Sequence, residues 1–172
     1  MTEKKKFSKR KNILWVDDDV NKPALEPDRD ELGERNCQII PESRPDNFLK
    51  IIKDDNKRID GFLIDCLLID TMMPKGNELS LNETSNTTRT GLALIKRLFE
   101  SGNYGTIPII VYSVVDEDEI KDFCFENKIP LSRITILNKS ISSRDFADKV
   151  VEIVEPKRKQ TTKANQYEEP QS

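Results

Sequence analysis

Polar side chains that could act together in catalysis or binding follow four of the short apolar runs in this 172-residue sequence. They are Asp17, Asp18, Asp70, Ser113 and Lys139. Clustered carboxylates repel each other unless a cation lies among them, and an all-oxygen cluster suits Mg²⁺. A lysine beside such a cluster can pair with a phosphoryl oxygen. If folding brings these residues together, the set is typical of phosphoryl transfer onto a carboxylate.

The composition excludes several other chemistries. The chain has no histidine, so it cannot hold a Ser-His-Asp triad, an HExxH zinc site or a phosphohistidine of its own. Its three cysteines show no CxxC spacing, which favours a reduced, cytoplasmic location. No apolar run approaches the roughly 18 residues of a membrane span, so we expect no membrane insertion.

Charge is distributed unevenly along the chain. Residues 12–155 carry 18 basic and 28 acidic side chains, whereas residues 1–11 carry six basic side chains and one acid. Residues 156–172 are also polar and weakly basic. We therefore expect a single acidic domain over 12–155 between two disordered tails, a basic one at 1–11 and a polar one at 156–172.

Short apolar runs alternate with helix-type segments throughout this domain. Near-continuous apolar runs are typical of strands buried on both faces, and their alternation with helices indicates an α/β parallel sheet covered on both sides. The segment 22–35, with two prolines and a glycine, predicts a short or distorted helix, and 92–99 predicts an amphipathic helix that ends at Gly102. Asp46, Asp116 and either Ser142 or Ser143 are expected helix caps. The expected strands are 13–16, 37–40, 62–69, 107–112 and 134–137.

The polar stretch 75–90 interrupts the alternation of strands and helices, between the third expected strand and the helix that follows it. Loops of this length inside compact α/β units are uncommon and are usually either functional or disordered. In a doubly wound sheet, ligands bind beyond the carboxyl ends of the strands. We expect the candidate residues to meet there, with the loop overhanging them.

Five motifs follow one another along the chain: ILWVDDD at 13–19, DTMMP at 70–74, Gly91-Leu92, IPIIVYS at 107–113, and Lys139. With these motifs in this order, residues 12–155 resemble the receiver domain of bacterial two-component response regulators. The resemblance implies a single (βα)5, flavodoxin-like doubly wound sheet with strand order 2-1-3-4-5.

What the resemblance implies for the site is specific. Asp70 would accept a phosphoryl group from a sensor histidine kinase or phosphotransfer protein. Asp17, Asp18, Asp70 and the backbone carbonyl of Met72 would hold Mg²⁺. Ser113 and Lys139 would bind the phosphoryl group and respond to it.

The sequence departs from the family pattern at two positions near Lys139. Ser140 follows it where a proline is usual, and Ile136 stands where many members carry an aromatic side chain. Asp65 also ends an apolar stretch and is an alternative phosphoacceptor, although it lacks the Met-Met-Pro context that follows Asp70.

The leading interpretation is a phosphorylation-dependent signalling switch rather than a turnover enzyme. We expect no DNA-binding or other output domain, because 17 residues follow Glu155, so the protein would act through an unknown downstream protein or as a phosphorelay. One alternative is a degenerate receiver that serves as a phosphorylation-independent interaction module. Another is a Mg²⁺-dependent phosphatase of the haloacid-dehalogenase type, for which Asp17-Asp18-Asp19 supplies an Asp-x-Asp motif.

Overall fold

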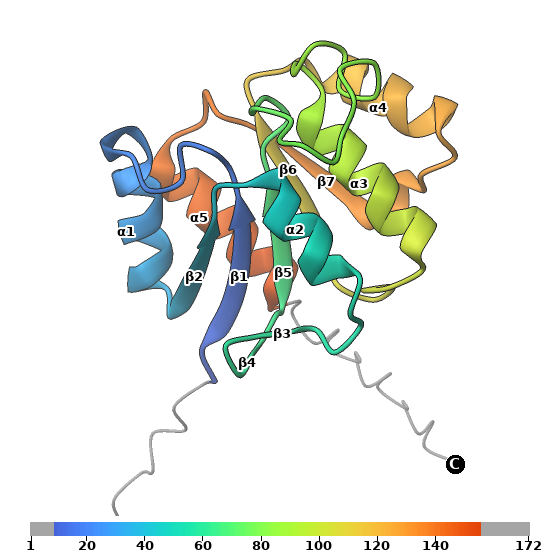
Figure 1. Ribbon diagram of the computed structural model, residues 1–172. Helices are drawn as coiled ribbons and strands as arrows, with labels where there is room; N and C mark the ends of the chain where they lie inside the picture. The colour runs from blue at the N-terminus through green and yellow to red at the C-terminus, as the bar shows by residue number, and fades with distance from the viewer. Residues whose placement is uncertain (1–8, 156–172) are drawn as a thin grey trace, which may run out of the picture.

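The computed structural model describes residues 9–155 and has a five-stranded parallel sheet at its centre (Figure 1). The strand order is β2-β1-β5-β6-β7, which confirms the expected 2-1-3-4-5 order for the main sheet. Lys11, assigned by the sequence to the basic tail, begins the first strand. The predictions for 1–8 and 156–172 lie outside the described residues. The strands are β1 (Lys11–Val16), β2 (Cys37–Glu42), β5 (Cys66–Ile69), β6 (Ile109–Ser113) and β7 (Ile134–Asn138).

Helices cover both faces of this sheet. One face packs against α1 and α5, which also contact each other, and the other packs against α2, α3 and α4 (Figure 1). Among residues 9–155, no helix combines the length and the apolar character needed to cross a membrane. The bounds are η1 (Pro23–Leu25), α1 (Glu26–Glu34), α2 (Pro45–Ile52), α3 (Thr90–Ser101), α4 (Glu117–Glu126), η2 (Leu131–Arg133) and α5 (Ser143–Val154).

The two-sided burial of the strands explains their apolar runs. In β1, Leu14 and Val16 enter the cluster under α2, α3 and α4, whereas Ile13 and Trp15 enter the cluster under α1 and α5. All four are fully buried. Alternate residues of a strand point to opposite faces, so the part of a strand that is covered by helices on both sides is apolar at successive positions.

The predicted third strand, 62–69, is wrong in extent. Phe62–Leu63 forms β4, which pairs antiparallel with β3 (Arg58–Ile59), and the sheet strand β5 starts only at Cys66. Asp60 and Gly61 form the two-residue turn between them, with φ of 49° and 82°. An Asp-Gly pair with positive φ at both residues is a strong hairpin signal, and here it ends the apolar run locally.

Two of the three expected caps are confirmed. The Asp116 carboxylate accepts the backbone N–H of Asp118 at 2.9 Å, and the Ser142 hydroxyl accepts that of Asp145 at 3.1 Å. Gly102 ends α3 with φ of 69°, as expected for a left-handed C-terminal residue.

The expectation that Asp46 caps α2 is wrong. Arg44 stands at the cap position and Pro45 opens the helix, which leaves Asp46 within the first turn. Its carboxylate instead accepts the backbone N–H groups of Asn77 at 2.9 Å and of Glu78 at 3.1 Å. These two bonds lower the pKa of Asp46. Asp46 therefore anchors the start of the polar loop 75–90 to α2.

Candidate functional site

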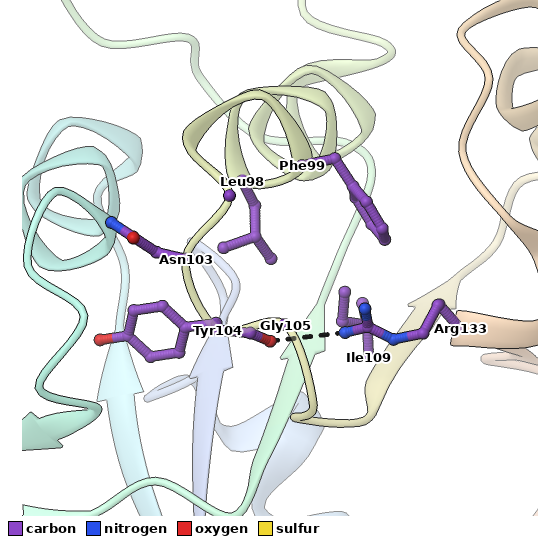
Figure 2. Close-up of a pocket in the computed structure, with 8 residues that line it drawn as sticks. Leu98, Phe99, Asn103, Tyr104, Gly105, Ile109 and Arg133 are labelled. Carbon is purple, nitrogen blue, oxygen red and sulfur yellow. Dashed lines mark hydrogen bonds between the residues drawn. The ribbon is translucent and has the colours of Figure 1, made fainter.

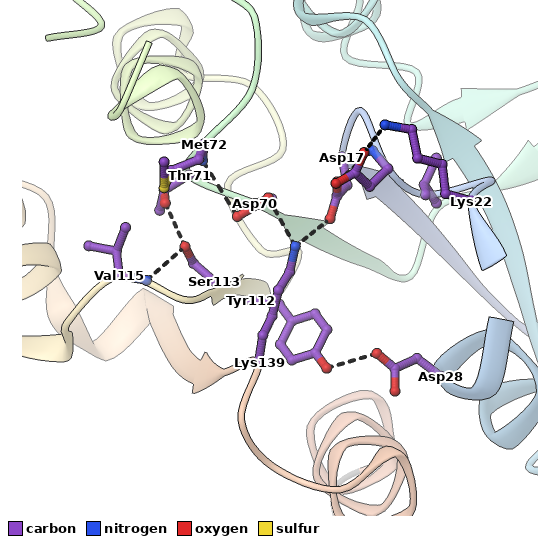
Figure 3. A network of polar contacts seen from close by, with 12 residues as sticks. Asp17, Lys22, Asp28, Asp70, Thr71, Met72, Tyr112, Ser113, Val115 and Lys139 are labelled. Carbon is purple, nitrogen blue, oxygen red and sulfur yellow. Dashed lines mark hydrogen bonds and ion pairs between the residues drawn. The ribbon is translucent and has the colours of Figure 1, made fainter. Parts of the chain in front are cut away.

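The candidate residues gather at the carboxyl edge of the sheet (Figure 3). Asp17 follows β1, Asp70 follows β5, Ser113 ends β6 and Lys139 follows β7. Asp17, Asp70 and Ser113 are buried, with exposures of 0%, 6% and 1%. The parallel pairing of these strands brings together residues that lie up to 122 positions apart in the chain.

Lys139 joins the two buried carboxylates. Its Nζ lies 2.9 Å from Asp17 Oδ2 and 3.0 Å from Asp70 Oδ2. The pKa of Asp70 is raised, because the effect of burial is larger than the opposing effect of the Lys139 ammonium. Burial alone would lower the pKa of Lys139, but the charges of Asp70 and Asp17 together raise it. The lysine thus holds both carboxylates at one point.

An acidic cluster lies beside this ion pair. Oxygen atoms of Asp17, Asp18 and Asp19 lie within 4.8 Å of one another. Burial and then the neighbouring charges of Asp19 and Asp17 raise the pKa of Asp18, so negative charge is crowded here. A hard, all-oxygen donor set of this kind fits Mg²⁺. Asp19 belongs to the cluster although the sequence did not single it out as a ligand.

Of the other two predicted ligands, Asp70 is connected to Asp17 of this cluster, whereas Met72 contacts Asp70. Asp70 shares the Nζ of Lys139 with Asp17, and the backbone N–H of Met72 lies 3.5 Å from Asp70 Oδ1. The Met72 side chain is 44% exposed. The segment after β5 is therefore partly exposed at Met72 and is connected to Asp17 through Asp70 and Lys139.

Asp65, the alternative phosphoacceptor, lies at the other end of β5. The strand begins one residue after it, and its Oδ2 accepts the backbone N–H of Asn12 at 2.8 Å. Asn12 is at the amino end of β1. Asp65 is therefore separated from Asp17 and Lys139 by the length of the strand.

A hydroxyl pair that the sequence did not predict links β6 to the segment after β5. Thr71 Oγ1 and Ser113 Oγ lie 2.6 Å apart, and each residue is 1% exposed. Ser113 Oγ also accepts the backbone N–H of Val115 at 3.2 Å. The only sequence signal for Thr71 is its position directly after Asp70.

The start of α3 lies against the same segment. The backbone N–H of Gly91 donates to Thr71 O at 2.9 Å, and the Thr90 hydroxyl donates to Met73 O at 2.6 Å. A Cβ at position 91 would lie 1.8 Å from the backbone oxygen of Asp70. Position 91 must therefore be glycine for α3 to approach this closely.

The aromatic residue next to Ser113 faces away from Ile136. Ile136 packs against the core cluster under α2, α3 and α4, whereas Tyr112 lies in the opposite cluster and its hydroxyl donates to Asp28 Oδ2 at 2.8 Å. The Tyr112 ring stacks on Phe146 at 4.2 Å, and Lys139 Nζ lies 5.7 Å from its centroid. The peptide bond before Ser140 is trans, as are the others in the described chain.

The loop 75–90 lies at the same end of the sheet as the site, above α3 and beside α4 (Figure 1). Leu79 and Thr84 within it are buried. Ion pairs connect Glu83 to Arg97 of α3 at 2.9 Å and Arg89 to Glu119 of α4 at 3.1 Å. The loop is thus packed against α3 and α4 at this end of the sheet.

A hollow of about 150 Å³ lies at the amino ends of β6 and β7, away from the acidic cluster (Figure 2). Leu98, Phe99 and Ile109 line it together with Arg133. The Arg133 guanidinium donates to Tyr104 O at 3.4 Å and lies 5.4 Å from the centroid of the Phe99 ring. These contacts hold the turn between α3 and β6.

The strand order and the carboxylates of Asp17, Asp18, Asp19 and Asp70 at one edge of the sheet, the acidic edge, define a doubly wound α/β domain. Its polar site lies beyond the carboxyl ends of the strands. Solved structures of receiver domains share this architecture. A CheY-like response regulator receiver domain protein from Methanospirillum hungatei JF-1 is 17% identical, with a TM-score of 0.57 over 84% of this chain and 94% of that one. A response regulator receiver protein from Sinorhizobium medicae WSM419 gives the same identity and TM-score over 87% and 98%.

A third similar structure is a response regulator from Burkholderia pseudomallei that contains a phosphorylated aspartic acid, a calcium ion and citrate. It is 16% identical, with a TM-score of 0.54 over 85% of this chain and 67% of that one. No protein-family model and no curated protein matches the sequence. The chain therefore has the CheY-like receiver fold, established by structure at low sequence identity.

Proposed function

We propose that this protein is a response-regulator receiver in which Asp70 accepts a phosphoryl group. The observation that carries the proposal is the buried carboxylate of Asp70, held by Lys139 next to the acidic cluster of Asp17, Asp18 and Asp19. A signalling switch needs a carboxylate nucleophile, a counter-charge for the phosphoryl oxygens and a site for a divalent cation. These groups adjoin one another at the carboxyl edge of the sheet.

In the proposed reaction, an Asp70 carboxylate oxygen attacks the phosphorus atom of a phosphohistidine on a partner protein or of a small acyl phosphate. A P–O bond to Asp70 forms while the P–N or P–O bond of the donor breaks, and the electron pair of that bond leaves with the donor. Lys139 pairs with a phosphoryl oxygen, and Ser113 donates its hydroxyl to another. Because the chain has no histidine, a phosphohistidine donor must be another protein.

The clustered oxygens of Asp17, Asp18 and Asp19 support a Mg²⁺ site at this edge of the sheet, and the ligands that we propose for the ion are Asp17, Asp18, Asp70 and the Met72 carbonyl. When bound, the ion would offset the negative charge of the carboxylates and of the phosphoryl group. The added charge at Asp70 would then change the contacts of Ser113 and Lys139 and be read by a downstream protein in the cytoplasm. The protein would act in this way as a switch and not as a turnover enzyme.

A phosphorylation-independent interaction module is the second candidate. The observation in its favour is Ile136, which packs against the core instead of offering a mobile aromatic side chain next to the site. In that case the acidic edge would hold the fold together without receiving a phosphoryl group. The two candidates differ in one measurable property, the phosphorylation of Asp70.

Incubation with Mg²⁺ and acetyl phosphate, followed by intact-mass measurement, tests the proposal. We expect a single phosphoryl adduct in the wild type, its loss in Asp70→Asn and its loss when Mg²⁺ is chelated. Asp65→Asn is the matched control, because its amide oxygen can still accept the N–H of Asn12 and the adduct should persist.

Other outcomes have definite meanings. An adduct that survives Asp70→Asn but is lost in Asp65→Asn would contradict the assignment of Asp70. No adduct from acetyl phosphate or from phosphorylated kinases would favour the interaction module. Turnover of a phosphate ester that Asp17→Asn abolishes would instead indicate a phosphatase.

A further inference from the structure

The Ser113 hydroxyl is already engaged before any phosphoryl group is present. Figure 3 shows it pointing toward Thr71, while the Asp70 carboxylate accepts a hydrogen bond from Lys139. The two hydroxyl oxygens of Thr71 and Ser113 lie 2.6 Å apart. Within the described residues, the Thr71 hydroxyl makes no other hydrogen bond. Because both residues are 1% exposed, water cannot readily replace either partner.

Thr71 is fixed by its backbone as well as by this bond. Its carbonyl accepts the N–H of Gly91 at the start of α3, and its Cα would lie 2.9 Å from a Cβ at position 91. Thr71 therefore cannot easily follow Ser113 if the serine moves. Ser113 lies at the end of β6, where the chain leaves the sheet toward α4, and its hydroxyl also fixes the N–H of Val115.

We propose that Thr71 is a positioning residue that holds the Ser113 hydroxyl in a resting contact and thereby opposes phosphorylation of Asp70. This inference rests on the proposed function. A phosphoryl oxygen on Asp70 competes with Thr71 for the Ser113 hydroxyl, and formation of the phosphorylated state breaks a buried hydrogen bond. The Thr71 hydroxyl thus sets how much phosphodonor is needed to switch the protein.

Thr71→Val tests this by removing the hydroxyl while keeping the shape of the side chain. The loss leaves the Ser113 hydroxyl without its resting partner, so the phosphorylated state gains relative to the resting state. We expect the acetyl phosphate concentration that gives half-maximal phosphorylation to fall roughly fivefold, as expected for one net hydrogen bond. Thr71→Ser keeps a hydroxyl and should behave as the wild type, whereas Ser113→Ala should raise the concentration required.

A second measurement needs no phosphodonor. The amide resonance of Val115 reports the position of the Ser113 hydroxyl, and it should shift and exchange faster in Thr71→Val while remaining as in the wild type in Thr71→Ser. An unchanged Val115 amide resonance in Thr71→Val would overturn the inference about Thr71, whether or not the proteins can be phosphorylated. A failure of all these proteins to become phosphorylated, the wild type included, would instead reject the proposed function.

The phosphorylation assay can also contradict the inference alone. If the wild type is phosphorylated and Thr71→Val needs as much donor as the wild type, or more, then Thr71 does not oppose phosphorylation. The urea midpoint of each variant checks that the comparison is made between folded proteins.

Discussion

Replacement of Gly91 by alanine is expected to destabilise the protein by about 3 kcal/mol, the upper part of the usual range for overpacking. The new Cβ would lie 1.8 Å from Asp70 O, 2.7 Å from Asp70 C and 2.9 Å from Thr71 Cα. All three are backbone atoms, so no side-chain rotation can relieve the contact. The start of α3 must move away, and its N–H bond to Thr71 O is lost. Urea unfolding measures the effect.

The matched control for this variant is Gly33→Ala. Gly33 lies in α1, is exposed and has no atom within 4 Å of the position that its Cβ would take. Alanine should be neutral or stabilise the helix by up to about 1 kcal/mol there. A Gly91→Ala protein with the urea midpoint of the wild type would show that α3 does not need its close approach to Asp70.

Lys139→Met should have the second large effect on stability, a loss of about 3 kcal/mol. The variant keeps much of the side-chain volume but leaves the carboxylates of Asp17 and Asp70 buried without the cation that both contact. Removal of one partner from a buried ion pair is costly because the remaining charge stays desolvated. Thermal or urea unfolding without divalent cations measures the loss.

Mg²⁺ should restore part of this stability, because a ligand that binds only the folded state stabilises it. We therefore expect a larger increase in Tm with added Mg²⁺ in Lys139→Met than in the wild type. Lys22→Met is the control, since Lys22 pairs with Asp19 at an exposed position where an ion pair contributes little. Equal losses in the two variants would contradict a special role for Lys139.

The sheet could be predicted from the sequence because its strands are buried on both faces. The buried centres of such strands are apolar on both faces, which makes residues 13–16 of β1 and residues 109–112 of β6 visible as uninterrupted runs followed by Asp17 and Ser113. The carboxyl ends of parallel strands share one edge, so the positions of Asp17, Ser113 and Lys139 followed from the fold class alone.

The extent of the third strand was harder to predict for a local reason. The run 62–69 contains both a hairpin strand and a sheet strand, and apolar character alone does not separate them. The Asp60-Gly61 pair before it was the available signal. Once the turn is placed there, β5 must be short, and Asp65 falls at its amino end.

Contacts between distant side chains could not be predicted from one sequence. Asp46 satisfies the ordinary pattern of a helix cap, yet its carboxylate binds the backbone of Asn77, 31 residues away. Thr71 meets Ser113 across 42 residues because of strand register and the position of α3. Neither pair has a composition or a spacing that marks it, since both depend on three-dimensional packing.

The burial of Trp15 has a practical consequence for optical measurements. It is the only tryptophan in the sequence, its ring is fully buried two residues before Asp17, and it contacts both Tyr112 and Phe146. Within the described chain its indole nitrogen has no hydrogen-bond partner. The protein therefore carries a single tryptophan fluorophore close to Asp17, and excitation at wavelengths that its three tyrosines do not absorb gives an emission with one origin and requires no external label.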